Sequence, residues 1–234
     1  MSAVGDDGWV SAVDLYKAML RDQVGPALRV HGFRGSSKLW IKVDAGSGDY
    51  AIVQAQSSTA SLASEVRFAI NLAVVPVPWW QWQQERFGSK TPREYDGLWH
   101  ARLTPHLSSG KRGGDRWWQL SDAASADACG REVIALLAEV GLPWLGRLLH
   151  RPTLIDLARQ HDPAISEPIK EVALPVLLSD EGPSPELDDA LQQLQTVVDA
   201  NPRLDRAAFD GLAQWIRDRA SSKAVARVGI DEGR

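Results

Sequence analysis

The stretch VRFAINLAV at residues 66–74 decides the fold that this sequence predicts. Large apolar side chains alternate along it with small or polar ones, and a period of two is typical of a β-strand with two different faces. Pro76 and Pro78 follow and end the strand, because proline cannot donate a hydrogen bond to a neighbouring strand. One face of the strand carries Phe68, Ile70, Leu72 and Val74, and the other carries Arg67, Ala69, Asn71 and Ala73.

The same period of two recurs on both sides of this strand. It predicts further strands over residues 38–43, 50–56, 98–103 and 116–120. The connections at 44–49 and 108–114 are too short for a crossover, so the strands that they join should run antiparallel. We therefore expect an antiparallel sheet of about five strands.

Neighbouring residues of a strand point to opposite faces, and this rule assigns the tryptophans of the predicted strands. In RWWQL at 116–120, Trp118 goes with Leu120 to the core, whereas Trp117 goes with Gln119 to the other face. The remaining strands place the following residues on the core face: Leu39, Ile41, Val43, Trp99, Ala101 and Leu103. They leave Trp40, His100 and Arg102 on the outer face of the sheet.

Helical spacing of apolar residues flanks the predicted sheet in the sequence. Residues 11–31 predict a helix with Ser11 as its N-cap, a kink or break at Gly25-Pro26 and an end at Gly32-Phe33. A short Trp-rich helix is expected over 78–87, with Gly88 as its terminating residue. Towards the C-terminus the expected helices cover about 125–141, 144–150, 153–161, 186–199 and 205–220, with a frayed tail after Ser221. An acidic linker is expected near 162–185, with one helical turn within 167–178.

These elements together predict an α+β fold. An N-terminal helix should cross one face of the antiparallel sheet, and the C-terminal half should be helical. We expect an α+β domain over residues 1–150 and a helical extension over residues 151–234.

Composition excludes several classes of protein. The net charge of −4 and the pI of about 5.7 argue against a partner of duplex nucleic acid, which needs a basic surface. Cys129 is the only cysteine, so an intramolecular disulfide and a CxxC metal or redox site are both impossible. The sequence has neither an apolar run near 18 residues nor the features of a signal peptide, which predicts no membrane span and favours the cytoplasm.

Several short motifs resemble an uncharacterised bacterial family, domain of unknown function 4304. They are a first helix ending in Gly32-Phe33, a strand closing on Gln56-Ser57, Ile70-Asn71-Leu72, Arg102-Leu103 and Trp117-Trp118 after an aspartate. The resemblance covers roughly residues 12–150. It implies an α+β fold, and it brings no established activity, cofactor or catalytic residues.

Motifs of catalysis are scarce. The sequence contains no GxSxG, no phosphate-binding GxxxxGK[ST] or GxGxxG, and no spacing of histidines typical of zinc ligands. Cys129 fits a small buried hydrophobic residue better than a nucleophile. The run SSGKRGGD at 108–115 fits a hairpin tip better than an anion-binding loop. We therefore predict no metal and no cofactor.

The outer face of the sheet is the best candidate for function. The residues predicted there as ligand-binding are Trp40, Asn71, His100, Arg102 and Trp117, and Trp79, Trp80 and Trp82 of the Trp-rich helix are predicted as a partner surface. Polar groups beside tryptophan rings are typical of ligand pockets and interfaces. The alternative is that the C-terminal helices cover this face and satisfy its polar groups internally.

The leading hypothesis is a non-enzymatic binding module for another protein or a small anionic ligand. The alternative is a small hydrolase that uses His100 with an acid such as Asp115, which pairing of strands 98–103 and 116–120 could bring close. Single-strand nucleic acid, stacked on exposed tryptophans, ranks third. The sequence does not determine the oligomeric state.

Overall fold

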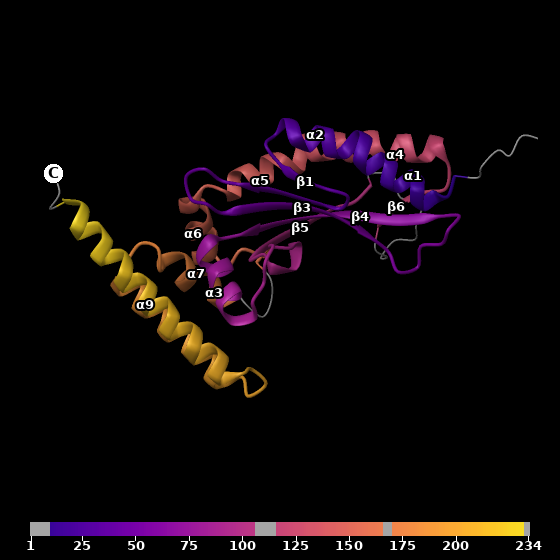
Figure 1. Cartoon of the computed structure of the whole chain (residues 1–234). Coiled ribbons are helices and arrows are strands. Elements are labelled where there is room, and N and C mark those ends of the chain that lie inside the picture. The colour runs from indigo at the N-terminus through magenta and orange to yellow at the C-terminus, as the bar shows by residue number, and fades with distance from the viewer. Residues whose placement is uncertain (1–9, 106–115, 166–169, 232–234) are drawn as a thin grey trace, which may run out of the picture. The chain divides into compact units, whose positions relative to one another are not determined.

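The computed structural model describes residues 10–105, 116–165 and 170–231, with side chains up to Val225 (Figure 1). The chain forms two compact units, and each unit is assembled from three segments. Unit 1 comprises Met1–Lys42, Val53–Leu72 and Arg102–Pro143, and unit 2 comprises Val43–Ile52, Ala73–Ala101 and Trp144–Arg234. The sequence instead predicted one boundary near residue 150.

The fold is α+β with an open antiparallel sheet, as the sequence predicts. The strands are β1 (Arg34–Ser36), β2 (Leu39–Val43), β3 (Tyr50–Ser57), β4 (Val66–Val75), β5 (Trp99–Leu103) and β6 (Trp118–Leu120). Their order is β1-β2-β3-β4-β5, and β6 also pairs with β4. The prediction missed β1, because Arg34, Gly35 and Ser36 show no alternation and all three are exposed.

The predicted pairing of β6 with β5 is wrong. Strand β6 runs antiparallel to the first residues of β4, with Phe68 opposite Trp118 and Val66 opposite Leu120. The sequence rule assumed that strands joined by a short connection pair with each other. The turn predicted over 108–114 and the residue Asp115 lie outside the described residues.

Unit 1 begins with α1 (Ala12–Met19) and α2 (Gly25–Val30), joined by a π-helical turn over Leu20–Val24. Ser11 Oγ accepts a hydrogen bond from Asp14 N at 3.2 Å, which confirms the predicted N-cap. The expected kink at Gly25-Pro26 takes the form of this wider turn, since Pro26 has no N–H to donate. Gly32 ends α2 at a φ of 84°.

The core of unit 1 lies between the sheet and these helices. Helices α1, α2 and α4 (Ala123–Leu136) lie on one face of the sheet (Figure 1). The ring of Phe68 on β4 lies 5.0 Å from the Tyr16 ring of α1 and 5.5 Å from the Trp118 ring of β6, measured between centroids. Phe68, Ile70 and Leu72 are buried, which confirms the predicted apolar face of β4.

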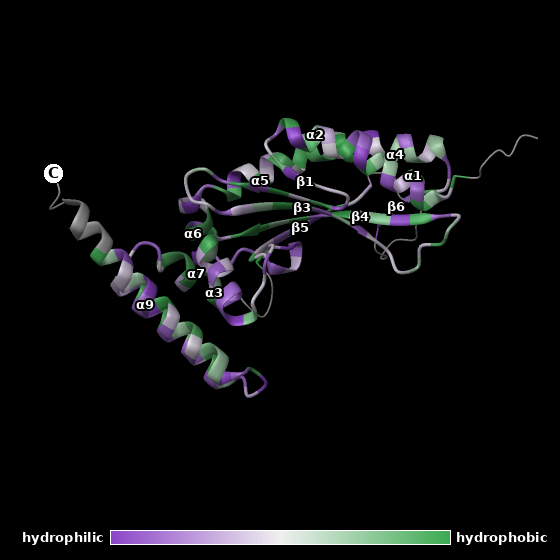
Figure 2. Cartoon of the chain, viewed as in Figure 1, coloured by the Kyte–Doolittle hydropathy of each residue, from purple (hydrophilic) through white to green (hydrophobic). Residues whose placement is uncertain are grey.

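Unit 2 contains α3 (Val77–Phe87) and most of the C-terminal helices. The latter are α5 (Leu142–Leu148, whose first two residues belong to unit 1), α6 (Arg151–Arg159), α7 (Lys170–Leu178), α8 (Pro185–Ala200) and α9 (Arg206–Asp231). Hydrophobic and hydrophilic residues alternate along α9 (Figure 2), and its buried side consists of Leu212, Ile216 and Ala220. Helix α9 continues to Asp231, so the predicted fraying after Ser221 is wrong.

The predicted linker near 162–185 contains a buried helix. Val172, Ala173 and Val176 of α7 are at most 1% exposed. The acids and prolines at the ends of this stretch suggested a linker, but the apolar run VALPVLL at 172–178 provides enough hydrophobic surface for a core helix. Pro175 lies inside α7 and is buried with it.

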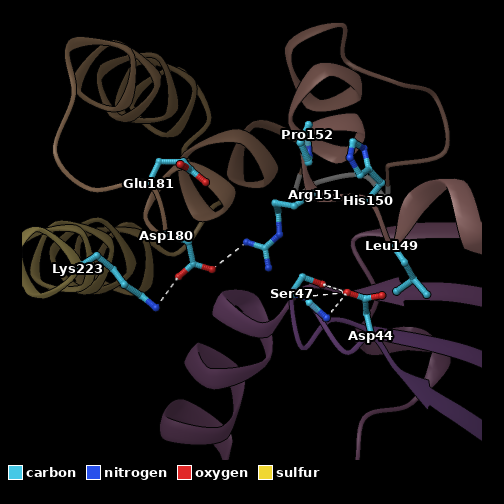
Figure 3. A pocket seen from close by; sticks show the side chains of 10 residues that line it. Asp44, Ser47, Leu149, His150, Arg151, Pro152, Asp180, Glu181 and Lys223 are labelled. Carbon is cyan, nitrogen blue, oxygen red and sulfur yellow. Dashed lines mark hydrogen bonds and ion pairs between the residues drawn. The ribbon is translucent and has the colours of Figure 1, made fainter. Parts of the chain in front are cut away.

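A buried carboxylate connects three segments of unit 2. Asp49, in the segment between β2 and β3, is 0% exposed. Its two oxygens accept hydrogen bonds from Arg151 Nε at 3.0 Å, Arg151 Nη2 at 2.5 Å and Val77 N at 2.8 Å. Arg151 also donates from Nη1 to Asp180 at 2.8 Å. Asp49 therefore links the start of α3 to the start of α6, and Arg151 extends this link to Asp180 at the end of α7 (Figure 3).

Asp180 extends this network to α9. Its Oδ1 accepts a hydrogen bond from Arg219 Nε at 2.9 Å and lies 3.5 Å from Lys223 Nζ. Burial acts to raise the pKa of the Asp180 carboxyl, but the charges of Arg219 and Arg151 outweigh it and hold this pKa below its usual range.

We predict that Arg151→Gln lowers the free energy of unfolding by about 3–5 kcal/mol, because it leaves the Asp49 carboxylate buried without its cation. Urea unfolding followed by circular dichroism measures the change. Arg217→Gln on the exposed side of α9 is the matched control and should be close to neutral. Equal effects of the two substitutions would show that the buried pair does not hold unit 2 together.

Candidate functional site

The strongest candidate site lies in unit 1 and centres on Arg102 of β5. The Arg102 side chain is exposed, and its Cζ lies 4.5 Å from the centroid of the Trp117 ring. Its Nη2 donates a hydrogen bond to Gln56 Oε1 at 2.9 Å. Trp117 is half-buried, so contacts with the protein hold its ring in place, and one face of the Arg102 guanidinium lies against this ring. A guanidinium can stack on an aromatic ring and use its in-plane N–H groups for hydrogen bonds at the same time.

Asn71 of β4 connects this arginine to the core. It is 6% exposed, and its Nδ2 donates to Gln56 Oε1 at 2.7 Å. The Gln56 oxygen therefore accepts from both Asn71 and Arg102. A buried amide without a partner would be costly, so Gln56 satisfies Asn71 and orients Arg102 with the same atom. We call Gln56, Asn71, Arg102 and Trp117 the Arg102 cluster.

His100 belongs to unit 2 and has its own partners there. Its Nε2 lies 2.7 Å from the carbonyl oxygen of Gly97, and a carbonyl only accepts, so this nitrogen carries a proton. Its Nδ1 lies 3.6 Å from Glu94 Oε1, and the His100 side chain is 23% exposed. Both ring nitrogens are thus directed at groups of the protein.

The prediction that Trp40 shares the outer face with Asn71 is wrong. Trp40 is 1% exposed, and its Nε1 lies 3.5 Å from the position that a Cβ would occupy on Gly25 of α2. The indole therefore packs against α2. Val43, expected in the core, is 56% exposed instead. The alternation of β2 was identified correctly. The face with Leu39, Ile41 and Val43 was assigned to the core because it has more apolar residues, but Trp40 on the other face is the buried one.

The tryptophans of α3 do not form an exposed patch. Trp80 is 3% exposed and contacts the Tyr50 ring edge-on at 6.3 Å. Trp79 Nε1 donates to Asp96 O at 2.9 Å, and the Trp82 ring lies 5.9 Å from that of Trp215. The predicted partner surface at Trp79, Trp80 and Trp82 is therefore corrected, because these rings pack between α3 and its neighbours within unit 2.

Sequence reasoning named three members of the Arg102 cluster and missed the fourth. Asn71, Arg102 and Trp117 were predicted, whereas Gln56 was noticed only as the end of a strand. A signal was present, since Gln56 is a polar residue at the end of the strand that precedes β4 in the sequence. Its role depends on which residue of β4 it faces, and alternation within one strand does not give that register.

Groups suited to metal binding or nucleophilic catalysis are not gathered near this cluster. Across residues 10–105, 116–165 and 170–231, no three His, Cys, Asp or Glu side chains are placed to hold a metal ion. Cys129 is 8% exposed, and burial raises the pKa of its thiol to about 11. The cluster itself presents hydrogen-bond donors and a cation, which suits recognition of an acceptor or an anion.

The buried thiol gives the second prediction. Cys129 in the folded protein should react with iodoacetamide at pH 8 about 100-fold or more slowly than in the urea-unfolded chain, because the thiolate is the reacting form and a pKa near 11 makes it rare. Mass spectrometry of timed samples measures both rates. Comparable rates would mean that Cys129 is accessible and ionised more easily than its surroundings indicate.

The exposed position of Arg102 gives the third prediction. Arg102→Gln should change the free energy of unfolding by less than about 1 kcal/mol, since exposed polar and cation–π contacts contribute little. Urea unfolding against the wild type measures this. A loss of several kcal/mol would assign Arg102 to the internal structure of unit 1 rather than to recognition.

Comparisons with known proteins complete the description. In the part of the chain with described structure, no single helix has both the length and the apolar composition to cross a membrane. No curated protein and no solved structure matches the chain. A family model, described as a domain of unknown function, matches residues 24–147, just over half of the chain, and these residues include every member of the Arg102 cluster. The chain belongs to this family, DUF4304.

Proposed function

We propose that this protein is a non-enzymatic binding module that recognises an anionic group on another protein or on a small molecule. The observation that carries the proposal is the exposed Arg102 guanidinium, stacked on Trp117 and hydrogen-bonded to Gln56. In this proposal Arg102 contacts the partner's anion and Trp117 contributes apolar contact area. Within the same proposal the protein works in the cytoplasm.

The arrangement lowers the cost of binding. An arginine that is mobile in the free protein loses side-chain entropy when a partner fixes it. Trp117 and Gln56 already restrict the Arg102 side chain, so less entropy is lost when a partner binds. Arginine and tryptophan are also the residue types that contribute most often to binding hot spots. The planar fork of Arg102 suits a carboxylate or phosphate, to which it can donate two parallel hydrogen bonds.

The contacts of His100 favour binding over the alternative hydrolase. A general base needs a ring nitrogen that faces the hydroxyl or water it deprotonates. In His100, Nε2 contacts Gly97 O and Nδ1 lies 3.6 Å from the Glu94 carboxylate, which is not such a group. Asp115, the example given for its acid partner, lies outside the described residues, and among the described residues Glu94 contacts His100.

The fourth prediction tests the binding module with matched arginines. Tagged wild-type protein, Arg102→Gln and Arg67→Gln are mixed at micromolar concentration with the purified products of genes that neighbour its own. Arg67 lies on β4, is exposed and pairs with Glu65 at 2.8 Å, so it is a comparable surface arginine outside the cluster. We expect a partner that the wild type and Arg67→Gln retain and that Arg102→Gln binds at least tenfold more weakly.

Two outcomes would contradict the proposal. One is a partner that binds all three proteins equally, which would place the interface elsewhere. The other is turnover of generic ester, phosphate or glycoside substrates that His100→Ala abolishes, which would favour the hydrolase.

A further inference from the structure

Strand β6 of unit 1 has an open edge beside the Arg102 cluster. Strand β4 lies on one side of β6, and among the described residues no strand pairs with β6 on its other side. Trp117, a member of the cluster, directly precedes this strand, and the exposed Gln119 lies at its centre. An open strand edge is a template for the addition of a strand from another chain. The edge of β6 is therefore a candidate for contact with a partner.

The backbone of Gln119 faces this open edge. In an antiparallel pair, successive residues direct their N–H and C=O groups to opposite sides of the strand. Arg67 O accepts a hydrogen bond from Ser58 N at 2.8 Å, and Arg67 N donates to Ser61 Oγ at 3.0 Å, so the backbone of Arg67 faces away from β6. The neighbours of Arg67 therefore form the hydrogen bonds to β6. Gln119 lies opposite Arg67 and directs its own N–H and C=O to the open side.

The main chain of Gln119 keeps hydrogen-bonding capacity at this edge. Its C=O accepts from the Cys129 thiol, with Sγ at 3.5 Å, and a thiol is a weak donor. No acceptor for its N–H is found among the described residues. The side chain of Gln119 turns to the outer face of the sheet, where its Nε2 donates to Glu65. Gln119 thus offers the main-chain donor and acceptor that a strand lying beside it requires.

The open edge adjoins the Arg102 cluster on one face of the sheet. Trp117 and Gln119 are two positions apart, so both side chains leave the sheet on its outer face, about 7 Å from each other. Arg102 stacks on Trp117, with its Cζ 4.5 Å from the ring centroid. A strand added beside β6 presents every second side chain to this face. Arg67 on the same face is paired with Glu65 at 2.8 Å, so we expect the added strand to carry one acid, directed at Arg102, rather than an acidic run.

We propose that an extended segment of a partner protein adds to the sheet beside β6 and presents one Asp or Glu to Arg102. This inference rests on the proposed function, and it names the partner as a protein segment rather than a small molecule. The main chain of Gln119 hydrogen-bonds to the segment and contributes affinity, whereas Arg102 selects the acid. Because β6 spans only three residues, the added strand is short.

The fifth prediction uses a phage-displayed library of short random peptides as the probe. Peptides that the full chain selects are synthesised, and fluorescence anisotropy measures their Kd. We expect micromolar binders with an Asp or Glu among residues that favour strands. Replacing that acid by Asn or Gln, or replacing Arg102 by Gln in the protein, should weaken binding at least tenfold.

Two substitutions of Gln119 separate main-chain pairing from contact with its side chain. Gln119→Pro removes the N–H that faces the open edge, and proline is tolerated on an edge strand where this N–H has no partner in the sheet. Gln119→Thr keeps the N–H and the preference for a strand but removes the long amide. We expect peptide binding at least tenfold weaker for Gln119→Pro and changed less than threefold for Gln119→Thr. Circular dichroism checks that both variants fold.

Amide hydrogen exchange in the wild type, followed by NMR, gives a second measurement that needs no substitution. The Gln119 amide should exchange at least tenfold more slowly when the selected peptide is bound, because the added strand then accepts its hydrogen bond. The Arg67 amide already donates to Ser61 and should change little. This measurement decides the question if Gln119→Pro does not fold.

Several results would overturn strand addition. They are a library that yields no binder, equal peptide binding by the wild type and Gln119→Pro, equal losses for Gln119→Pro and Gln119→Thr, and no protection of the Gln119 amide. A dimer in sedimentation experiments that Gln119→Pro dissociates would instead place a second copy of this chain on the edge. Peptide binding that depends on Arg102 but not on the Gln119 main chain would leave the binding module standing and refute only the strand.

Discussion

Strand β4 must bury a polar amide, and the candidate site of unit 1 depends on how that amide is satisfied. One face of β4 presents Phe68, Ile70 and Leu72 to the helices, and the other face carries Asn71, which is also buried. The Gln56 oxygen supplies the acceptor that Asn71 needs and holds Arg102 at the same time. A requirement of the core therefore fixes the position of an exposed arginine.

Unit 2 follows the same principle with a charge in place of an amide. Asp49 is fully buried, and its carboxylate needs Arg151 and Val77 N as partners. Arg151 also donates a hydrogen bond to Asp180, and Asp180 forms ion pairs with Arg219 and Lys223 of α9. Arg151, Arg219 and Lys223 thereby lie against two acids, of which Asp49 is fully buried. In both units, a polar group that the fold must bury fixes the position of an arginine side chain.

Local patterns in the sequence were enough to predict most elements of the fold. Alternation identified β4, β5 and β6 and separated the buried Trp118 from the half-buried Trp117. Capping rules identified the start of α1 at Ser11 and the end of α3 at Gly88, which adopts a φ of 67°. These features depend on a few neighbouring residues, so a single sequence contains the information.

Long-range pairings were beyond the same rules. Asp49 and Arg151 lie 102 positions apart, and nothing in either local segment indicates that the other is its partner. The face of Trp40 depends on its packing against α2, and the pairing of β6 with β4 depends on register rather than on the length of a connection. Helix α7 was expected as no more than one helical turn within a linker, because flanking acids and prolines outweighed a short apolar run.

The measurement that tests this account most directly is the order of the Arg102 side chain in solution. The account requires that the ring of Trp117 and the amide of Gln56 hold the guanidinium in place before any ligand arrives. Nitrogen-15 relaxation at Arg102 Nε should give an order parameter close to that of the rigid backbone, about 0.85, and Gln56→Leu should lower it. An Arg102 side chain as mobile as that of the exposed Arg217 would contradict the account.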